Sequence, residues 1–363
     1  MNFRCLLSAV SVACMALVSL AEPPHAFRQR LVTVHRQDRR DCSLKASADD
    51  YAFVDGAQVV VPDDAPRLVR RAAEDFCDYL LVSMGVNASL RTASRPAKRG
   101  LETCVVVTTG RRGEREFAVS VTDDGVRLDA TDARMAAQAF YHLEDRMNFR
   151  KGPFLKKESY VRRPMFTHRL TFSGFGNDIF PDAHLNQLAH YGFTGIEVWL
   201  CNYDVIAQGA RQDVNDLIAR AAKYGLDVQL SPRNRAFVHP DDPQAHARYD
   251  AAYGAMARYY PKALGIKFTG EVCEFPSKDP RSNGRSYRDP SPKDPNDHRP
   301  NPGWFPCSDW ADWVRTVEGI VREYNPSCKF ILSTYNWGNK DERARADLIA
   351  ALPKDITLIP VFE

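Results

Sequence analysis

The second half of the chain alternates between short apolar runs and longer segments with helical spacing. Strand-like runs are predicted at residues 166–172, 195–200, 226–230, 264–268, 329–333 and 356–362. Helices are predicted between them at residues 182–191, 214–224, 245–260, 308–324 and 341–351. A regular alternation of strands and helices is typical of a parallel α/β fold.

The first half has a different order of elements. A strand at 59–61 and a helix at 68–85 are followed by a strand at 104–109. A hairpin turns at Asp123-Asp124-Gly125, and a helix at 133–147 closes the unit. This pattern predicts a compact α+β domain over residues 51–150. We expect residues 22–50 to be a polar lead-in without periodicity and residues 151–163 to be a linker.

The amino terminus has the features of a leader. Arg4 precedes an apolar run from Cys5 to Leu20, and Ser19 and Ala21 are the small residues that a signal peptidase recognises. The run is shorter than the roughly 18–20 residues of a membrane-spanning helix. We expect residues 1–21 to be removed and the protein to be secreted or periplasmic, without a membrane partner after cleavage. A lipoprotein anchored through Cys14 is the weaker alternative.

Composition narrows the classes of partner. The 363 residues are enough for about two domains. The 49 basic and 46 acidic residues nearly cancel, which gives no argument for a nucleic-acid partner. No HxH, HExxH, GxGxxG or P-loop spacing occurs, so we expect neither a metal site nor a cofactor. The cysteines are scattered, and Cys273 with Cys307 is the pair we would test for a disulfide because it would close the base of a long loop.

Several motifs resemble one known domain. They are Val-Val-Val-Pro-Asp-Asp from Val59, the helical segments Arg71–Tyr79 and Ala136–Glu144, and Asp124–Asp129. Together they resemble the non-catalytic domain that precedes the barrel in family 20 β-N-acetylhexosaminidases and family 67 α-glucuronidases. In those families an Arg-Pro pair leads into the first barrel strand, and Tyr160–Met165 is similar to it. The likeness covers roughly residues 50–363 with loose motifs, and it implies a hexosaminidase-type domain followed by a TIM barrel.

The number of strands departs from a complete barrel. A (β/α)₈ barrel has eight strands in about 250 residues, whereas residues 164–363 supply about six strand-helix units. We therefore predict an α/β fold with an incomplete (β/α)₈ TIM barrel. Either the sequence is truncated at its carboxyl end or the sheet is open, and we favour truncation because an open sheet would expose buried-type edges.

Candidate catalytic residues follow the predicted fourth strand. In a barrel, residues just beyond the carboxyl ends of the strands carry the chemistry. Glu271 comes directly after Thr269-Gly270 and is our first candidate for a general acid. Glu274 is its neighbouring alternative, and Glu363 after the last strand is a candidate second carboxylate. The competing interpretation is that these glutamates only form ion pairs with arginines.

Other polar and aromatic residues are expected at the same end of the barrel. Those proposed to bind substrate are Arg169, Trp199, Asn202, Arg233, Trp304, Tyr335, Asn336 and Trp337, and Glu197 is among the remaining polar residues at the strand ends. Planar rings stack on sugars while amides and charges bind hydroxyl groups. The segment 275–307 contains eight prolines and is either a loop over the site, carrying Trp304, or a disordered surface insertion.

The resemblance also indicates a reaction. Family 20 enzymes carry adjacent Asp and Glu after the fourth strand, and here Gly270 stands at the position of the Asp. A lone acid after that strand, with a base from a later strand, is similar to the α-glucuronidase arrangement, where Arg169 or Arg233 would receive a uronate. We predict a secreted glycoside hydrolase, α-glucuronidase-like or hexosaminidase-like, with a carbohydrate substrate. The alternative is a catalytically inactive carbohydrate-binding protein on a degenerate barrel.

Overall fold

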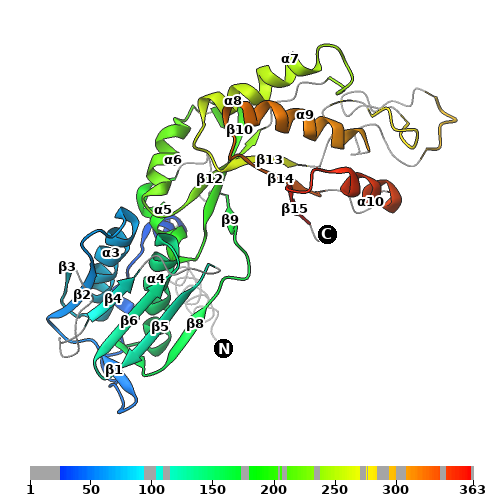
Figure 1. Cartoon of the computed structure of the whole chain (residues 1–363). Helices are drawn as coiled ribbons and strands as arrows, with labels where there is room; N and C mark the ends of the chain where they lie inside the picture. The colour runs from blue at the N-terminus through cyan, green and yellow to red at the C-terminus, as the bar shows by residue number, and fades with distance from the viewer. Residues whose placement is uncertain are drawn as a thin grey trace, which may run out of the picture.

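The protein has two lobes, each built on its own sheet (Figure 1). The computed structural model describes residues 25–93, 104–108, 115–172, 180–202, 205–206, 211–232, 238–269, 275, 277–283, 294–299, 308–335 and 341–360. Residues 104–108, 202 and 205–206 are described by their backbone alone. We call residues 50–162 the amino-terminal lobe and residues 170–360 the barrel lobe.

The amino-terminal lobe contains a six-stranded sheet with the order β3-β2-β4-β6-β5-β8. Its strands are β2 (Ala57–Pro62), β3 (Ala88–Ala93), β4 (Cys104–Thr108), β5 (Phe117–Thr122), β6 (Gly125–Ala130) and β8 (Ser159–Arg162). Neighbours from β3 to β6 are parallel, and β5 is antiparallel to both β6 and β8. A separate antiparallel pair joins β1 (Asp50–Ala52) to β7 (Phe154–Lys156).

Two long helices, α3 (Arg67–Met84) and α4 (Ala133–Arg150), pack on this sheet. Helix α3 ends where Gly85 adopts the left-handed conformation at φ 62°, which glycine reaches without steric cost. Asp132 caps α4 by accepting a hydrogen bond from the Met135 amide at 2.9 Å. The Phe76 and Phe140 rings, one from each helix, lie 5.4 Å apart in the core.

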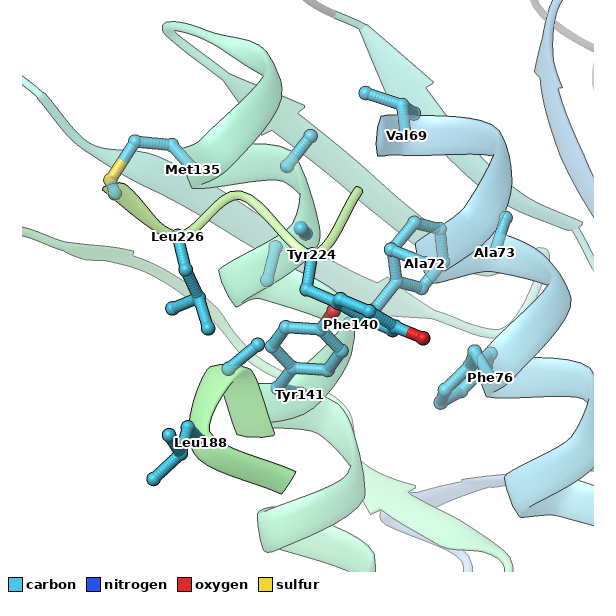
Figure 2. Packing of buried hydrophobic residues seen from close by; sticks show 14 of the residues in the cluster. Val69, Ala72, Ala73, Phe76, Met135, Phe140, Tyr141, Leu188, Tyr224 and Leu226 are labelled. Atoms are coloured by element: carbon cyan, nitrogen blue, oxygen red, sulfur yellow. The ribbon is translucent and has the colours of Figure 1, made fainter. Parts of the chain in front are cut away.

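The hydrophobic core continues from one lobe into the other. Figure 2 shows side chains of α3 and α4 packed against side chains from α5 and from the segment after α6. The labelled residues are Val69, Ala72, Ala73, Phe76, Met135, Phe140, Tyr141, Leu188, Tyr224 and Leu226. All of these side chains are buried in one cluster. The two lobes are therefore held together by apolar packing as well as by polar contacts such as the Arg134–Asp227 ion pair at 2.9 Å.

The segments expected to be a lead-in and a linker contain regular structure. Helix α2 (Ala26–Val32) and a 3₁₀ turn, η1 (Gln37–Arg39), lie within the lead-in. Strands β7 and β8 fall within residues 151–163, and β8 completes the amino-terminal sheet beside β5. These elements are only three to seven residues long, so they carry too little periodicity to be recognised in the sequence.

The barrel lobe has six consecutive strands, each parallel to the next. They are β9 (Leu170–Thr171), β10 (Gly195–Asn202), β12 (Asp227–Pro232), β13 (Gly265–Thr269), β14 (Lys329–Ser333) and β15 (Thr357–Ile359). A short strand, β11 (Val205–Ile206), runs antiparallel to β10. Sequential parallel order is the topology of a TIM barrel, and the predicted incomplete barrel of six units is confirmed.

Helices connect these strands and cover the outer face of their sheet. They are α5 (Asp182–His190), α6 (Val214–Ala222), α7 (Ala245–Tyr249), the π-helical turn η2 (Asp250–Gly254), α8 (Ala255–Tyr259), α9 (Asp309–Tyr324) and α10 (Glu342–Ala351). The single helix predicted at 245–260 is thus interrupted by a π turn. Figure 1 shows α7, α8 and α9 side by side along the barrel sheet, in agreement with their mutual contacts.

Side chains alternate between the two faces of the barrel sheet. On β10, Ile196, Val198 and Leu200 are buried in the apolar cluster that includes the helices, so they form the outer face. Glu197 and Trp199 therefore point to the inner face, since successive residues of a strand point to opposite sides. Among the described residues, no helix is both long enough and apolar enough to cross a membrane.

Candidate active site

Many of the predicted site residues lie outside the described part of the chain. These are Glu271, Glu274, Glu363, Arg233, Trp304, Asn336 and Trp337, together with both cysteines of the predicted disulfide, Cys273 and Cys307. Asn202 ends β10 and is described by its backbone alone. The roles given to these residues stay predictions. The site discussed below is built from described residues alone.

An ion pair lies on the inner face of the barrel sheet. Lys267 on β13 extends across β12 to Glu197 on β10, and its Nζ lies 2.8 Å from Oε2 and 3.0 Å from Oε1. Trp199 donates its indole N–H to Oε1 of the same carboxylate at 2.8 Å. The Glu197 carboxylate therefore accepts three hydrogen bonds, and only 3% of this residue is exposed. This carboxylate is held in one orientation by two neighbours on the same face.

Two aromatic rings lie above the ion pair. Phe172, just past the end of β9, has its ring centroid 5.1 Å from Lys267 Nζ, which is cation–π distance. The Phe172 and Trp199 rings meet edge to face with centroids 5.5 Å apart. Phe172 is 46% exposed and Trp199 is half-buried, whereas Glu197 is buried. Solvent exposure thus increases from the buried Glu197 carboxylate toward Phe172 at the carboxyl end of β9.

The base of the site is polar, which is unusual for a barrel interior. TIM barrels are commonly filled by layers of branched apolar side chains. Here the register places Glu197 beside Gln229 of β12, and Gln229 is fully buried with no hydrogen bond to its side-chain amide among the described residues. Burying an ion pair and an amide costs free energy. Buried polar groups beside aromatic rings are the composition of a ligand site.

Lys267 is a functional candidate that the sequence does not reveal. It lies within the apolar run 264–268, where the neighbouring side chains Ile266 and Phe268 face the helices. A lysine in such a run points to the opposite face of the strand, and this is the signal that would identify it. Glu197 lies among the strand-end residues in the sequence, but nothing there indicates its partner.

Arg169 lies at the opposite end of the barrel from the predicted site. Only residues 170–171 of the predicted first strand form β9, so Arg169 precedes the strand. Its Nε donates to the Gly192 carbonyl at 2.6 Å, and its Nη1 donates to the Phe166 carbonyl at 2.5 Å. The predicted role in substrate binding at the carboxyl ends is corrected on this geometry. Arg169 instead joins segments at the amino-terminal end.

Tyr335 lies on the expected side of the barrel. It comes two residues after the end of β14, past the carboxyl end of that strand, and 42% of it is exposed. The backbone beside it is fixed, since the Thr334 amide donates to the Ile359 carbonyl at 3.1 Å. Tyr335 is thus an exposed ring at the rim, on the strand next to the one that carries Lys267.

Solved structures similar to this chain are glycoside hydrolases. The family 20 β-N-acetylhexosaminidase of Streptomyces coelicolor A3(2) has a TM-score of 0.55 at 13% identity, covering 91% of this chain and 75% of that one. The fold is that of the β-N-acetylhexosaminidases. The Streptomyces plicatus N-acetyl-β-hexosaminidase gives a TM-score of 0.55 at 13% identity, with 94% of this chain and 75% of that chain covered.

A third similar structure is the β-N-acetylhexosaminidase of Bacteroides fragilis NCTC 9343, with a TM-score of 0.52 at 10% identity over 86% of this chain and 67% of that one. No protein-family model matches the sequence, and a search of the curated proteins gave no match either. The predicted structural resemblance to family 20 is confirmed. Because identity is low, the likeness establishes the fold, and the chemistry has to be argued from the residues.

Proposed function

We propose that the protein is an exported glycoside hydrolase that cleaves O-glycosidic bonds in a polysaccharide or glycan. The observation that carries the proposal is the Glu197–Lys267 pair at the base of an aromatic-rimmed inner face. Keeping a desolvated ion pair in a barrel interior costs stability. A ligand site at the carboxyl ends of the strands, where barrel enzymes carry out their chemistry, accounts for that cost.

The proposed acid is Glu271, which follows the end of β13 by two residues. A carboxylic acid at this place protonates the glycosidic oxygen of the leaving group, while a second carboxylate acts as base or nucleophile. Glu363 is the candidate for that second role, and Glu274 is the alternative acid. Glu197 is not assigned to proton transfer because its oxygens already accept from Lys267 and Trp199. It positions the floor of the site instead.

The substrate class follows from the rim. Trp199 and Phe172 offer apolar ring surface against which a pyranose can pack. The similar solved structures are named as β-N-acetylhexosaminidases, which favours an N-acetylhexosaminide as one test substrate. An α-glucuronide is the other, because a lone acid after the fourth strand is similar to the α-glucuronidase arrangement. Since Arg169 is engaged elsewhere, Arg233 is the remaining candidate for a uronate carboxylate.

The proposal is tested on the full chain produced with its leader. The intact mass of the exported protein shows whether cleavage falls after Ala21. Aryl N-acetyl-β-hexosaminides and aryl α-glucuronides are then assayed with the wild type, with Glu271→Gln and, as the matched control three residues away, with Glu274→Gln. Loss of a general acid lowers kcat by about 10²–10⁴-fold. We expect this loss for Glu271→Gln and a much smaller one for Glu274→Gln.

Three results would change the proposal. Unaltered turnover in Glu271→Gln removes this residue from the mechanism, and a loss confined to Glu274→Gln transfers the role to Glu274. Saturable binding of oligosaccharides without turnover by the wild type supports the carbohydrate-binding alternative. Absence of both binding and turnover across hexosaminides and uronides rejects the proposal for these substrate classes.

A further inference from the structure

Four metal-ligating side chains meet where the two lobes join, far from the inner face of the barrel. His35 belongs to the segment between α2 and η1, Asp75 to α3, Glu144 to α4, and His190 is the last residue of α5. We call these four residues the interlobe cluster. The ligand atoms of His35, Asp75 and His190 all lie within 4.8 Å of one another. Glu144 approaches the same His190 nitrogen from a second side.

The distances suit a single small cation. His190 Nε2 lies 2.8 Å from Asp75 Oδ2 and 3.2 Å from Glu144 Oε2, and His35 Nε2 lies 3.5 Å from Asp75 Oδ1. Around a tetrahedral Zn²⁺ with bonds of about 2.0–2.1 Å, neighbouring ligand atoms are roughly 3.3 Å apart. The observed separations bracket this value. The single ligand atoms that His35, Asp75 and His190 would each offer lie within 4.8 Å of one another, so an ion between them requires the side chains to move closer together.

The ring of His190 is oriented as in metal-binding histidines. Its Nδ1 is 2.9 Å from the Asn186 carbonyl oxygen, so Nδ1 carries the proton and donates to that oxygen. Nε2 then faces the two carboxylates. A hydrogen bond from the second ring nitrogen to a carbonyl oxygen is the usual support of a metal-bound imidazole. Tyr141 packs against the ring at a centroid distance of 4.0 Å, with the two ring planes tilted by 35°, and restricts its orientation.

The surroundings of Asp75 and His35 also suit metal ligands. Asn186 donates its side-chain amide to Asp75 Oδ1 at 2.8 Å, which holds the carboxylate in place from outside the cluster. The His35 side chain is 10% exposed, its Nε2 has only the 3.5 Å contact with Asp75 Oδ1, and its Nδ1 has no hydrogen-bond partner among the described residues. A buried polar group without a partner costs about 1–3 kcal/mol. A ligand bond to a cation would satisfy it.

A simpler arrangement has to be weighed against an ion. Burial opposes a charge on His190, but the Glu144 and Asp75 carboxylates outweigh it and raise the pKa of this histidine to about 10. The resulting imidazolium would pair with both carboxylates. That arrangement pairs His190 with Asp75 and Glu144, whereas His35 Nε2 has only the 3.5 Å contact with Asp75 Oδ1 and His35 Nδ1 has no hydrogen-bond partner among the described residues. His35 is therefore the residue that separates the two explanations.

We propose that His35, Asp75, Glu144 and His190 bind one divalent transition-metal ion, with Zn²⁺ the best fit. Two imidazole nitrogens and two carboxylate oxygens are a donor set that Zn²⁺ accepts. Two carboxylates neutralise the ion, and four protein ligands without an open position are typical of a structural rather than a catalytic site. The ion would clamp the amino-terminal segment and the first barrel helix, α5, onto the amino-terminal lobe.

The sequence conceals such a site because its ligands come from four separate segments. Metal signatures in sequence depend on short ligand spacings within one turn, hairpin or helix. Here each ligand stands alone on its own element. A cavity of about 340 Å³, whose lining includes Tyr141, Asp145 and His190, adjoins the cluster at His190.

The experiment measures Zn²⁺ uptake by the full chain. Protein stripped with dipicolinic acid and dialysed is titrated with ZnCl₂ by calorimetry, and metal content is determined by plasma mass spectrometry. We expect one ion per chain, a rise in thermal midpoint on Zn²⁺ addition, and visible ligand-field absorption with Co²⁺. His35→Gln is the main variant because it sits outside the helices of the core, and Glu144→Gln is the second because it keeps the side-chain shape.

Each ligand variant should weaken Zn²⁺ binding by about 100-fold or more, since ligand loss exceeds the 10–100-fold effect of an outer-shell change. The matched control is His246→Gln, which removes an exposed histidine on α7 and should bind as the wild type does. A folded chain that takes up no stoichiometric Zn²⁺ overturns the proposal. Wild-type affinity in both His35→Gln and Glu144→Gln overturns it equally, and the cluster is then an ion pair of His190 with two carboxylates.

Discussion

The outer and inner faces of the barrel sheet are built from alternate residues of the same strands and differ in almost every physical property. The outer face presents side chains such as Val198, Phe268 and Phe330 to the helices, and these are fully buried. The inner face presents Glu197 and Lys267 to each other. One strand thus supports an apolar contact on one side and a charged contact on the other.

This difference separates stability from function within a single sheet. Burial of apolar area contributes roughly 25 cal/mol per Å², and the outer face packs its side chains into apolar clusters with the helices. An ion pair on the inner face contributes little net stability and costs desolvation. Truncation of a side chain on the outer face should therefore lower the free energy of unfolding. On the inner face, the free energy of unfolding should depend more on whether a charged residue keeps its partner than on side-chain volume.

The largest effect is expected from truncation on the outer side. Trp313 of α9 is buried against Phe268, with ring centroids 4.7 Å apart, and against Tyr253 at 6.0 Å. Trp313→Ala should lower the free energy of unfolding by about 3–5 kcal/mol, because it removes apolar contact and leaves a cavity. Urea unfolding followed by circular dichroism measures the change.

A matched control for Trp313 is the exposed aromatic Phe149 on α4, which is 86% exposed. Phe149→Ala should change the free energy of unfolding by no more than about 0.5 kcal/mol. Equal losses in the two variants would contradict the assignment of the outer face as the main source of stability in the barrel lobe.

A smaller net effect is expected when the inner pair is removed as a whole. Lys267→Met leaves the Glu197 charge buried without its partner and should cost about 3 kcal/mol, at the lower end for a broken buried pair. Adding Glu197→Gln should recover most of that loss, because the amide oxygen still accepts from Trp199. A double-mutant cycle in urea yields the coupling energy, and strict additivity of the two changes would disprove a direct pair.

The mildest test uses the native protein without any substitution and compares the reactivity of its cysteine thiols. Cys328, which precedes β14, is packed in the outer apolar cluster, and burial raises the pKa of its thiol to about 12. Cys201, near the carboxyl end of β10, is half-buried and belongs to neither apolar cluster. Against an ordinary thiol, the Cys328 thiolate fraction near neutral pH is lower by roughly 10³-fold.

Alkylation of the native protein by iodoacetamide, followed by peptide mass spectrometry, should therefore label Cys201 well before Cys328. The exposed Cys42 provides an internal reference for a freely accessible thiol. Labelling of Cys328 at the rate of Cys42 would show that the outer face is open to solvent, and the contrast between the faces would fail.

The architecture was readable from the sequence because its signals are local. Strands and helices of the barrel lobe alternate with apolar periodicity, and the glycines after α5 and α6 adopt positive φ at Gly192 and Gly225. The hairpin at Gly125 is another local signal, and it joins β5 to β6 as predicted. Such features need no knowledge of distant partners.

The site was less predictable because its contacts are not local. Lys267 lies within an apolar run of the sequence. Its contact with Glu197 depends on the placement of β10 and β13 on either side of β12, which the sequence does not show. The sequence predicts Arg169 at the carboxyl end of the first strand, whereas it precedes that strand, because the sequence does not show where the strand begins. His35 stands in a polar segment without periodicity, and its neighbours come from three other elements. The roles of Glu271, Glu274 and Glu363 stay predictions.

Strand β8 has a consequence for how the two lobes can be divided. It pairs with β5 through residues 159–162, and Ser120 and Ser159 share a hydrogen bond between their hydroxyl oxygens at 2.8 Å. The amino-terminal lobe is therefore complete only when the chain has almost reached the first barrel strand at Leu170. Limited proteolysis, or genetic recombination of modules, would have to cut between Arg162 and Leu170 to leave the first sheet intact, and a cut near residue 151 would remove its edge.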